Sequence, residues 1–469
     1  MNSNPSHAHD NWPHGAAPAD PPPPAGIADI AGHAGAADMP CPTDTRRATR
    51  AQARRAVVAA SLGNILEWYD FVLYAYFSPQ IAHHFFPAAS ESTSFLVAIA
   101  TFGVGFVARP VGAAVLGAYG DRAGRKAALL VVILLMAIGT AMIGLTPAFD
   151  TAGVYASISI VIARVLQGFA SGGEWGGATS FIVEYAPANR RGLYGSWQQA
   201  SLAVALLLGS LTAGVMTWFM STQALNDWGW RMPFVLGAVV IGTFGFWLRR
   251  NVEEPPRGDA RARTPPSSPI RTALREQRRA LGIGSLFTVG WTVTNYLYLL
   301  YMPIYLTRTL GLPASEALAA VSLQIACFMV LSPVMGRLSD RWGRRPLMSA
   351  GALCVLVGTY PLFALMSAYP HTLPVLGALC LLATFMAMMT GPAPAWQVEL
   401  YPAAVRTTSI SLSYNVSVTI FGGFAPFVAT WLIGTTGNVL SLTWYIAAGA
   451  LASFVASRLS RETAHSALI

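Results

Sequence analysis

The sequence contains one ten-residue pattern twice: Gly117-Ala-Tyr-Gly-Asp-Arg-Ala-Gly-Arg-Lys126 returns as Gly336-Arg-Leu-Ser-Asp-Arg-Trp-Gly-Arg-Arg345. The two aspartates are 219 positions apart (340 minus 121). A second motif, Glu184-Tyr-Ala-Pro-Ala-Asn-Arg-Arg191, resembles Glu399-Leu-Tyr-Pro-Ala-Ala-Val-Arg406 with an offset of 215 (399 minus 184). Two motifs with nearly the same offset predict that the chain consists of duplicated halves.

The rest of the sequence around these motifs is strongly apolar. Hydrophobic residues make up 54% and charged residues 11% of 469 positions, and the mean hydropathy is +0.48. This composition excludes a soluble globular protein. Apolar runs of about 20 residues are long enough to cross a bilayer as helices. We therefore predict an all-α membrane protein with twelve transmembrane helices near residues 57–82, 94–119, 126–147, 153–185, 192–220, 231–249, 281–307, 317–337, 346–368, 373–397, 407–434 and 439–458.

The distribution of basic residues predicts the orientation of these helices. Of the 30 Lys and Arg residues, 26 fall in the tails and in loops on one side, whereas Arg231 and Arg308 fall on the other. Short cytoplasmic loops retain positive charge, so both termini are expected on the cytoplasmic side. The protein itself is expected in the inner membrane of a bacterium. The expected segments are a disordered tail (1–50), a six-helix bundle (51–250), a cytoplasmic linker (251–280), a second six-helix bundle (281–460) and a C-terminal tail (461–469).

The first repeated motif resembles the G-x-x-x-D-R-x-G-R-[KR] signature of the major facilitator superfamily. Leu166-Gln-Gly-Phe-Ala-Ser-Gly-Gly173 resembles the fourth-helix signature of sugar and metabolite porters. Gly63-Asn-Ile-Leu-Glu-Trp-Tyr-Asp-Phe71, together with Arg164-Val-Leu-Gln-Gly168, resembles the metabolite:proton symporter family. The resemblance covers residues 56 to about 460. It implies two pseudo-symmetric six-helix bundles and proton-coupled import of citrate, tricarballylate, 2-oxoglutarate or shikimate, or of proline and betaine.

Different parts of the chain resemble different members of that family. The region from Ser409 to Pro426 looks closest to citrate and tricarballylate symporters, whereas the seventh helix, with Thr294-Asn-Tyr296, looks closer to proline and betaine carriers. The main expectation is therefore symport of a small organic acid with protons. A proline or betaine symporter is the alternative, in which aromatic residues would recognise a cation. A transporter-like membrane sensor is the remote alternative.

Ionisable residues deep inside membrane helices are candidates for function, because each costs several kcal/mol unless it faces a cavity or a partner. Arg109 and Arg164 are both expected near the membrane midplane. Glu67 and Asp70 share one face of the first helix, and Tyr74 continues that face. Two neighbouring carboxylates resist joint ionisation, so one of them is a candidate proton carrier.

In the functional interpretation, Arg109 or Arg164 binds a substrate carboxylate and Glu67, Asp70 or Glu174 exchanges the proton. Arg164 would alternatively hold Glu174 or Asp70 in a static ion pair. The second half contains little buried charge, so we expect neutral recognition there by Asn295, Tyr296, Tyr414 and Asn415. By resemblance, the motif loops form an inner gate that contains Asp121, Arg122, Arg125, Asp340, Arg341 and Arg344.

Other classes of activity lack their signatures in this sequence. There is no G-x-x-x-x-G-K-[ST] loop, no H-E-x-x-H pair and no serine-triad motif, so we expect no enzyme activity, no cofactor and no metal. The net charge of +9 follows from the topology and requires no nucleic-acid partner. The expected partners are a small organic acid, protons and the lipid bilayer, and each chain is expected to work as a monomer.

Overall fold

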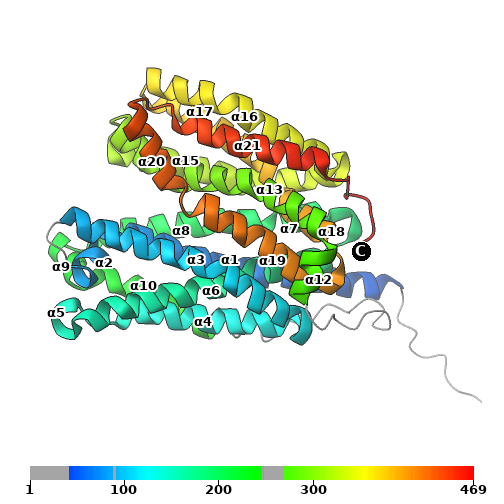
Figure 1. The fold of residues 1–469 in the computed structure, drawn as a ribbon, viewed down its shortest axis with the longest axis horizontal. Helices are drawn as coiled ribbons and strands as arrows, with labels where there is room; N and C mark the ends of the chain where they lie inside the picture. Colours follow the sequence, from blue (N-terminus) through cyan, green and yellow to red (C-terminus); the bar gives the residue numbers. More distant parts are fainter. Residues whose placement is uncertain (1–41, 88–90, 246, 248–268, 469) are drawn as a thin grey trace, which may run out of the picture. The chain divides into compact units, whose positions relative to one another are not determined.

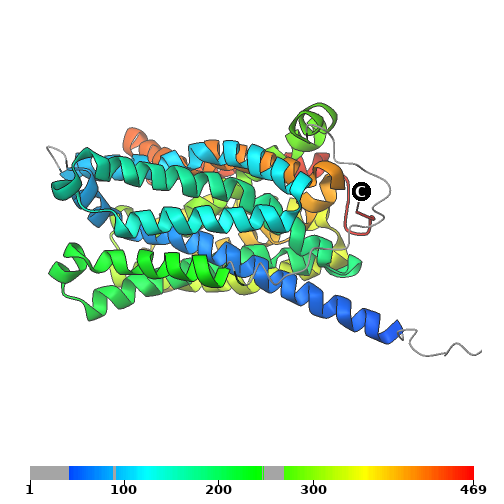
Figure 2. The same cartoon turned by 90° about the horizontal axis from the view of Figure 1, so that it is seen from below.

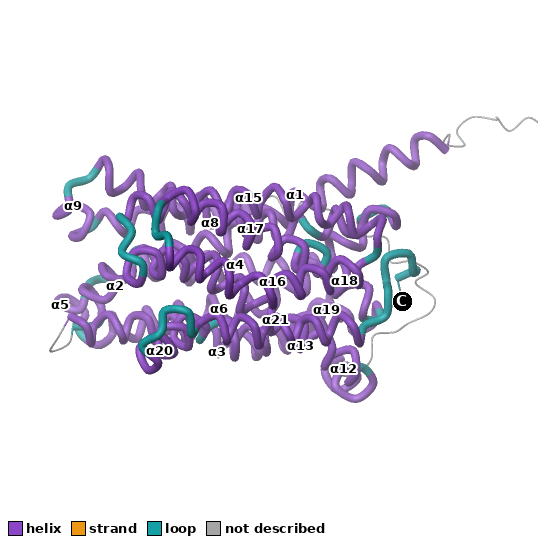
Figure 3. Tube along the Cα trace, turned by 90° about the horizontal axis from the view of Figure 1, so that it is seen from above, coloured by secondary structure: helices purple, strands orange, loops and turns teal. Residues whose placement is uncertain are grey.

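The computed structural model describes residues 42–87, 91–245, 247 and 269–468. Every regular element among these residues is a helix, and they contain no strand (Figure 3). The expectation of an all-α protein is therefore confirmed.

The first half of the chain forms a series of long helices joined by short ones (Figure 1). Their bounds are α1 (Pro42–Tyr76), α2 (Ser78–Phe85), α3 (Glu91–Ala123), α4 (Arg125–Leu145), α5 (Phe149–Ala152), α6 (Val154–Tyr185), η1 (Ala188–Arg190), α7 (Arg191–Gly195), α8 (Trp197–Phe219), α9 (Thr222–Asp227), η2 (Gly229–Arg231), α10 (Met232–Val239) and the π-helical η3 (Val240–Gly245).

The second half repeats this pattern. Its helices are α12 (Pro269–Glu276), α13 (Arg278–Asn295), η4 (Tyr296–Tyr301), α14 (Met302–Ile304), η5 (Tyr305–Thr309), α15 (Ala314–Trp342), α16 (Arg344–Ala368), α17 (Thr372–Thr390), α18 (Ala393–Leu400), η6 (Ala403–Val405), α19 (Arg406–Ser417), η7 (Val418–Gly422), α20 (Ala425–Thr436) and α21 (Leu442–Leu459). Three of these segments, η4, η5 and η7, are π-helical. Such wide turns often occur at functional sites, and η4 begins at Tyr296.

Eight helical segments among the described residues are long and apolar enough to cross a membrane by themselves, and Gly229–Thr243 is a shorter apolar helix. The remaining expected spans correspond to α1, to α3 and to the continuous helical run from α13 through η5. Together these segments give the twelve spans of the expected fold.

Two boundaries differ from the expected ones. Helix α1 begins at Pro42, inside the tail that we expected to be disordered up to residue 50, because residues 46–56 consist mainly of the helix formers Ala, Arg and Gln. Helix α12 lies within the expected linker 251–280. The other residues of the expected tail and linker, 1–41 and 251–268, lie outside the described residues.

Within residues 46–469 the two halves lie side by side and meet along α8 and α19. Helix α19 packs on α3 and α6, and α15 packs on α7 and α8. Figure 1 shows α8 and α19 between the remaining helices of the two halves. The boundary between the halves is thus lined by α1, α3, α6 and α8 on one side and by α13, α15, η4 and α19 on the other.

The repeated motif forms the same turn in both halves. Gly124 separates α3 from α4 and Gly343 separates α15 from α16, and both have a φ of 100°. Only glycine adopts this conformation without strain, which explains why the motif has glycine at this position. The turn reverses the chain between two long helices and leaves the charged motif residues at one end of the bundle.

Glycines also let α3 and α6 approach each other closely. A Cβ atom on Gly168 would collide with the backbone of Gly105, and one on Gly172 would collide with the carbonyl oxygen of Arg109. Close helix approach through small residues is common in membrane bundles. This contact fixes Arg109 on α3 and Arg164 on α6 beside α1.

Candidate functional site

The first buried charge cluster is centred on Asp70 of α1, which is 1% exposed. Its Oδ1 accepts a hydrogen bond from Thr140 Oγ1 at 2.9 Å, and its Oδ2 accepts one from Gln167 Nε2 at 2.6 Å. Arg164 Nη1 lies 3.6 Å from the same Oδ2. Both carboxylate oxygens therefore have hydrogen-bond donors, and residues of two helices, α4 and α6, hold Asp70 in one position.

Tyr74 completes this cluster from the side of α1. The guanidinium carbon of Arg164 lies 3.5 Å from the centre of the Tyr74 ring, which is cation–π distance. Arg164 is fully buried between this ring and Asp70. Tyr74 thus contacts Arg164, so that this arginine is enclosed by its own half of the protein.

The second charge pair joins Glu67 of α1 to Arg109 of α3. Arg109 Nη2 lies 3.7 Å from Glu67 Oε1, and Arg109 is 1% exposed. The guanidinium carbon also lies 4.8 Å from the ring centre of Phe71 and 4.7 Å from that of Phe106. Nε and Nη2 of Arg109 make no hydrogen bond to any described residue. Arg109 therefore still has donors available for a ligand, whereas both carboxylate oxygens of Asp70 already accept hydrogen bonds.

Residues of the second half face the Arg109 pair. The Tyr296 ring lies 6.2 Å from Trp68 and 5.7 Å from Phe106, centre to centre. Tyr296 also lies within electrostatic range of Arg109 and Glu67, and its hydroxyl makes no hydrogen bond to the described part of the chain. The structure thus brings together, across the boundary between the halves, a carboxyl group, a guanidinium group and a phenolic hydroxyl.

Asn295 lies next to Tyr296 on the wall of a small cavity between the halves. Trp68, Leu202, Leu206, Leu299 and Leu300 form the rest of this wall. The cavity measures about 10 Å³, which is space for about one water molecule. The Asn295 side-chain oxygen makes no hydrogen bond within residues 42–87, 91–245 and 269–468. The boundary is closed around these residues, with little free space beside them.

Tyr414 and Asn415 of α19 contact the first half directly. The Tyr414 ring is stacked on Trp175 of α6, with 4.1 Å between centres and 7° between planes. Trp175 Nε1 donates a hydrogen bond to Gln397 Oε1 at 3.0 Å, and Asn415 Nδ2 donates one to the Gly172 carbonyl at 2.8 Å. These contacts tie the two halves together beside the Arg109 pair, since Tyr414 lies within electrostatic range of Arg109 and Glu67.

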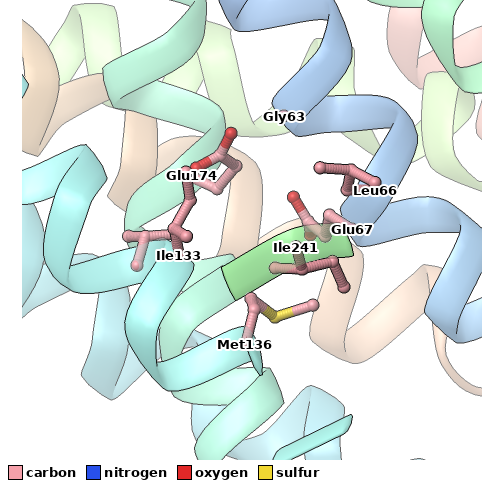
Figure 4. Close-up of a pocket in the computed structure, with 8 residues that line it drawn as sticks. Gly63, Leu66, Glu67, Ile133, Met136, Glu174 and Ile241 are labelled. Atoms are coloured by element: carbon pink, nitrogen blue, oxygen red, sulfur yellow. The ribbon is translucent and has the colours of Figure 1, made fainter. Parts of the chain in front are cut away.

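Glu174 lies away from that boundary, inside the first half. It is 1% exposed and lines a cavity of about 10 Å³ together with Glu67, Leu66, Ile133 and Met136. Figure 4 shows Glu67 from α1 and Glu174 from α6 on opposite sides of this cavity, above Met136. Glu67 therefore contacts Arg109 and also lines the cavity that it shares with Glu174.

The gate residues of the second motif copy join the halves at one end of the bundle. Asp340 on α15 accepts hydrogen bonds from the backbone amides of Gly192 at 2.8 Å and Leu193 at 2.9 Å, at the start of α7. Its Oδ1 also lies 2.8 Å from Arg344 Nη2. The negative charge thus caps the positive end of a helix that belongs to the other half.

The remaining gate candidates have different surroundings. Arg344 is fully buried and pairs with Glu399 at 3.3 Å, whereas Arg122 and Arg341 are exposed beside the two motif turns. The side chains of Asp121 and Arg125 lie outside the described residues. Asp340 of the second copy therefore provides a contact that joins the halves at this end.

The C-terminal tail takes part in this gate, which the sequence did not indicate. Glu462 accepts hydrogen bonds from the backbone amides of Arg344 at 2.8 Å and Arg345 at 3.0 Å, and thereby caps α16. Thr463 Oγ1 donates to Glu399 Oε2 at 2.6 Å, and Arg191 Nη1 donates to the Ser466 carbonyl at 2.9 Å. The tail thus contacts both halves.

Trp175, Gln167 and Thr140 also carry contacts that sequence analysis did not assign to the site. Trp175 stands between two glycine pairs in Gly172-Gly-Glu-Trp-Gly-Gly177, so a large side chain among small ones was the available signal. Gln167 is part of the fourth-helix motif, but Thr140 and Glu462 have no motif around them. Their roles follow only from contacts between distant segments.

Comparison with known proteins gives family matches to both halves. The model described as sugar (and other) transporter matches residues 56–257, and the model of the major facilitator superfamily matches residues 292–467. The citrate-proton symporter of Klebsiella pneumoniae is 35% identical over 402 residues, which cover 86% of this chain and 90% of that protein. The proline/betaine transporter of Escherichia coli (strain K12) is 32% identical over 423 residues, which cover 88% of this chain and 84% of that protein.

A solved structure has a similar fold. The proton:xylose symporter XylE bound to 6-bromo-6-deoxy-D-glucose has a TM-score of 0.75 and 19% sequence identity, and the match covers 90% of this chain and 98% of that one. At this identity the likeness concerns the fold alone. It confirms the expected arrangement of two helical halves.

Proposed function

Because this chain belongs to the major facilitator superfamily, we propose that it transports a small organic acid together with protons by alternating access. The observation that carries the proposal is the state of Arg109. This arginine is buried at the boundary between the halves and retains two nitrogens without hydrogen bonds to described residues. A substrate carboxylate is the ligand that would satisfy them.

The Glu67–Arg109 pair offers a direct way to couple substrate and proton. An ionised Glu67 competes with the substrate carboxylate for Arg109, since both are anions within reach of one guanidinium. Protonation of Glu67 removes this competition and leaves Arg109 to the substrate. Substrate and proton then bind together, which is the requirement for symport.

We assign Asp70 and Arg164 to support of the site. Asp70 already accepts two hydrogen bonds, and Arg164 is enclosed by Asp70 and Tyr74. Removing one partner of such a buried pair is strongly destabilising, by roughly 3–5 kcal/mol. Glu174, across a water-sized cavity from Glu67, is the proposed next acceptor of the proton.

The opposite wall of the site comes from the second half. Tyr296 would donate a hydrogen bond to the substrate, and Asn295 would contact it through its amide. Tyr414 and Asn415 contact α6 when the halves are closed. These two residues would therefore stabilise the closed arrangement and also contact the substrate. This division follows from charge: the first half supplies the arginine and the second half supplies neutral groups.

The charged end of the bundle is the proposed inner gate. Asp340, Arg344 and the tail hold the halves together there, and inward release of substrate requires these contacts to break. We propose that this end faces the cytoplasm of a bacterial cell, with both termini on that side and a monomer as the working unit. We also propose that the chain is divided into two tails, two six-helix bundles and a linker between the bundles. We propose no catalytic step.

The name of the E. coli relative makes a proline or betaine symporter the second candidate. In this structure, however, Arg109 occupies the faces of Phe71 and Phe106, and Trp68 lies within 5.9 Å of the same guanidinium. The aromatic residues that would otherwise surround a quaternary ammonium already surround an arginine. This favours an anionic ligand.

The test is transport by the purified protein in lipid vesicles. We expect labelled citrate or 2-oxoglutarate to accumulate under an imposed inward proton gradient, and betaine not to accumulate. Arg109→Gln combined with Glu67→Gln removes both charges of the pair and should fold but abolish acid uptake, whereas the control Arg308→Gln changes an exposed arginine and should transport normally. Betaine accumulation, or acid uptake by the double variant, would contradict the proposed site.

A further inference from the structure

Helix α12 carries exposed positive charge that the transport site does not use. Pro269 and Ala273 are buried, whereas Arg271, Leu274 and Arg275 are exposed, so the helix has one packed face and one open face. Leu274 is 53% exposed. Residues three and four positions apart lie on the same side of a helix, which brings Arg271 close to both Leu274 and Arg275.

The start of α13 extends this charged face. Only Gln277 separates α12 from α13, and Arg278 and Arg279 are both exposed. Arg278 Nε donates a hydrogen bond to the Leu274 carbonyl at 3.2 Å, so Arg278 lies at the end of α12. The only exposed acidic residue in this segment, 269–279, is Glu276. The exposed residues of this segment therefore include four arginines, one leucine and one glutamate.

The direction of α12 differs from that of the membrane-spanning helices. In Figure 1 it runs across the long helices at the end of the bundle, and Figure 2 shows it end-on at the edge of the bundle. It contacts α3, α13 and α19 through its packed side. The spanning helix α13 becomes apolar at Leu281, a few residues after α12 ends. Helix α12 therefore lies at the depth where the chain leaves the hydrocarbon.

We propose that this face of α12, formed by Arg271, Leu274, Arg275, Arg278 and Arg279, binds the headgroups of anionic phospholipids. A guanidinium group matches a phosphate with two parallel hydrogen bonds, and a flat amphipathic helix inserts its apolar residue at the boundary of the acyl chains. The contacts with α3 and α19, which come from different halves, place the bound lipid beside the proposed inner gate. The proposal concerns lipid binding and does not depend on which substrate is transported.

A nonspecific basic surface, or a docking site for an acidic protein, would behave differently from a lipid site. If a basic surface attracted an anionic membrane without a specific site, every exposed arginine at this end would contribute equally. Such arginines include Arg337, Arg458 and Arg461. An acidic protein partner would bind the same charges but would have no need of Leu274 or of a lipid. The experiment therefore compares α12 with a matched set and lipid with an acidic polypeptide.

The test measures binding of phosphatidylglycerol and phosphatidylcholine to the purified full-length protein by native mass spectrometry. Wild type should retain phosphatidylglycerol in preference to phosphatidylcholine, and less so at high salt. Each basic residue near an anionic surface contributes about fivefold, so Arg271→Gln/Arg275→Gln/Arg278→Gln should weaken phosphatidylglycerol binding about 100-fold. The control Arg337→Gln/Arg458→Gln/Arg461→Gln should keep wild-type binding.

Leu274→Ser should also weaken binding although it leaves every arginine in place. The proposal is overturned if the α12 triple variant binds phosphatidylglycerol like wild type, or if the control triple variant loses as much. It is equally overturned if excess polyglutamate displaces the lipid from wild type. All variants change exposed side chains, and a thermal unfolding midpoint in detergent equal to that of wild type would show that they fold.

Discussion

Replacement of Glu67 by glutamine tests the coupling mechanism most directly. Glu67→Gln removes the anion 3.7 Å from Arg109 Nη2 and keeps a side chain of nearly the same size. At an effective dielectric constant of about 20, a pair of charges at this distance interacts by about 4.5 kcal/mol, part of which is offset by desolvation. The substrate would no longer have to displace this partner from Arg109.

The expected result is tighter substrate binding that no longer depends on the protonation of Glu67. A hydrogen bond to a charged group contributes about 1.5–3 kcal/mol, which corresponds to about 10-fold to 100-fold in affinity. Wild type should therefore bind labelled acid more weakly as the pH rises, while Glu67→Gln should bind at every pH as wild type does at low pH. Scintillation proximity binding between pH 5.5 and pH 8 measures this difference.

Transport provides the second half of this test. Glu67→Gln should exchange labelled for unlabelled substrate across the vesicle membrane, because exchange needs no net proton movement. It should fail to concentrate substrate under a proton gradient. If the variant still concentrates substrate, or if its affinity falls with pH as in wild type, Glu67 is not the coupling group and the competition for Arg109 is refuted.

Three further substitutions test the gate and the turns. Asp340→Asn weakens the charge-assisted cap on α7 and should open that end of the bundle. A cysteine introduced at Ala395 should then react with a maleimide several-fold faster than the same cysteine in an otherwise wild-type chain. An unchanged rate would contradict the gate. Glu462→Gln should increase the same reactivity to a smaller extent, since Asp340 remains, and equal or larger effects would reverse the assigned order. Gly343→Ala places a Cβ atom at a φ of 100° and should lower the free energy of unfolding by about 1–2 kcal/mol, measured by denaturation in detergent, whereas Gly377→Ala, which meets open space, should not.

The sequence predicted the features that depend on local pattern. The repeated motif predicted duplicated halves, and the structure places a left-handed glycine, Gly124 or Gly343, at the corresponding turn of each half. Hydropathy predicted the spanning helices, including α1 and α3, which contain the buried residues Glu67, Asp70 and Arg109. Depth along the helix predicted that Arg109 and Arg164 are buried, because a helix rises by a fixed distance per residue.

The pairing of those charges was beyond the sequence. Glu67 and Asp70 are three residues apart on one helix, and only the rotation of α1 against α3 and α6 decides that Glu67 meets Arg109 and Asp70 meets Arg164. Thr140 was equally hidden, since its hydroxyl reaches Asp70 from a third helix. Contacts of this kind depend on helix packing, which no local pattern encodes.

The contacts between the halves were the least predictable. Tyr414 was expected to bind substrate, but the structure stacks it on Trp175, 239 positions earlier (414 minus 175). The hydrogen bonds of Glu462 join a tail without a motif to the start of α16. In both cases the local sequence does not distinguish the side chain. Its role comes from a contact with a segment that is distant in the sequence.

The capping of α16 by Glu462 has a consequence for biosynthesis. The ribosome synthesises the chain from its N-terminus, so residues 460–468 are made after every described spanning helix. The bonds from Arg344 and Arg345 to Glu462, and from Arg191 to Ser466, therefore cannot form until these spanning helices have been synthesised. Before residues 460–468 are made, Asp340 and the Glu184–Arg406 ion pair hold the halves together without the contacts of this tail, so a chain truncated before Glu462 should have a less tightly closed inner end.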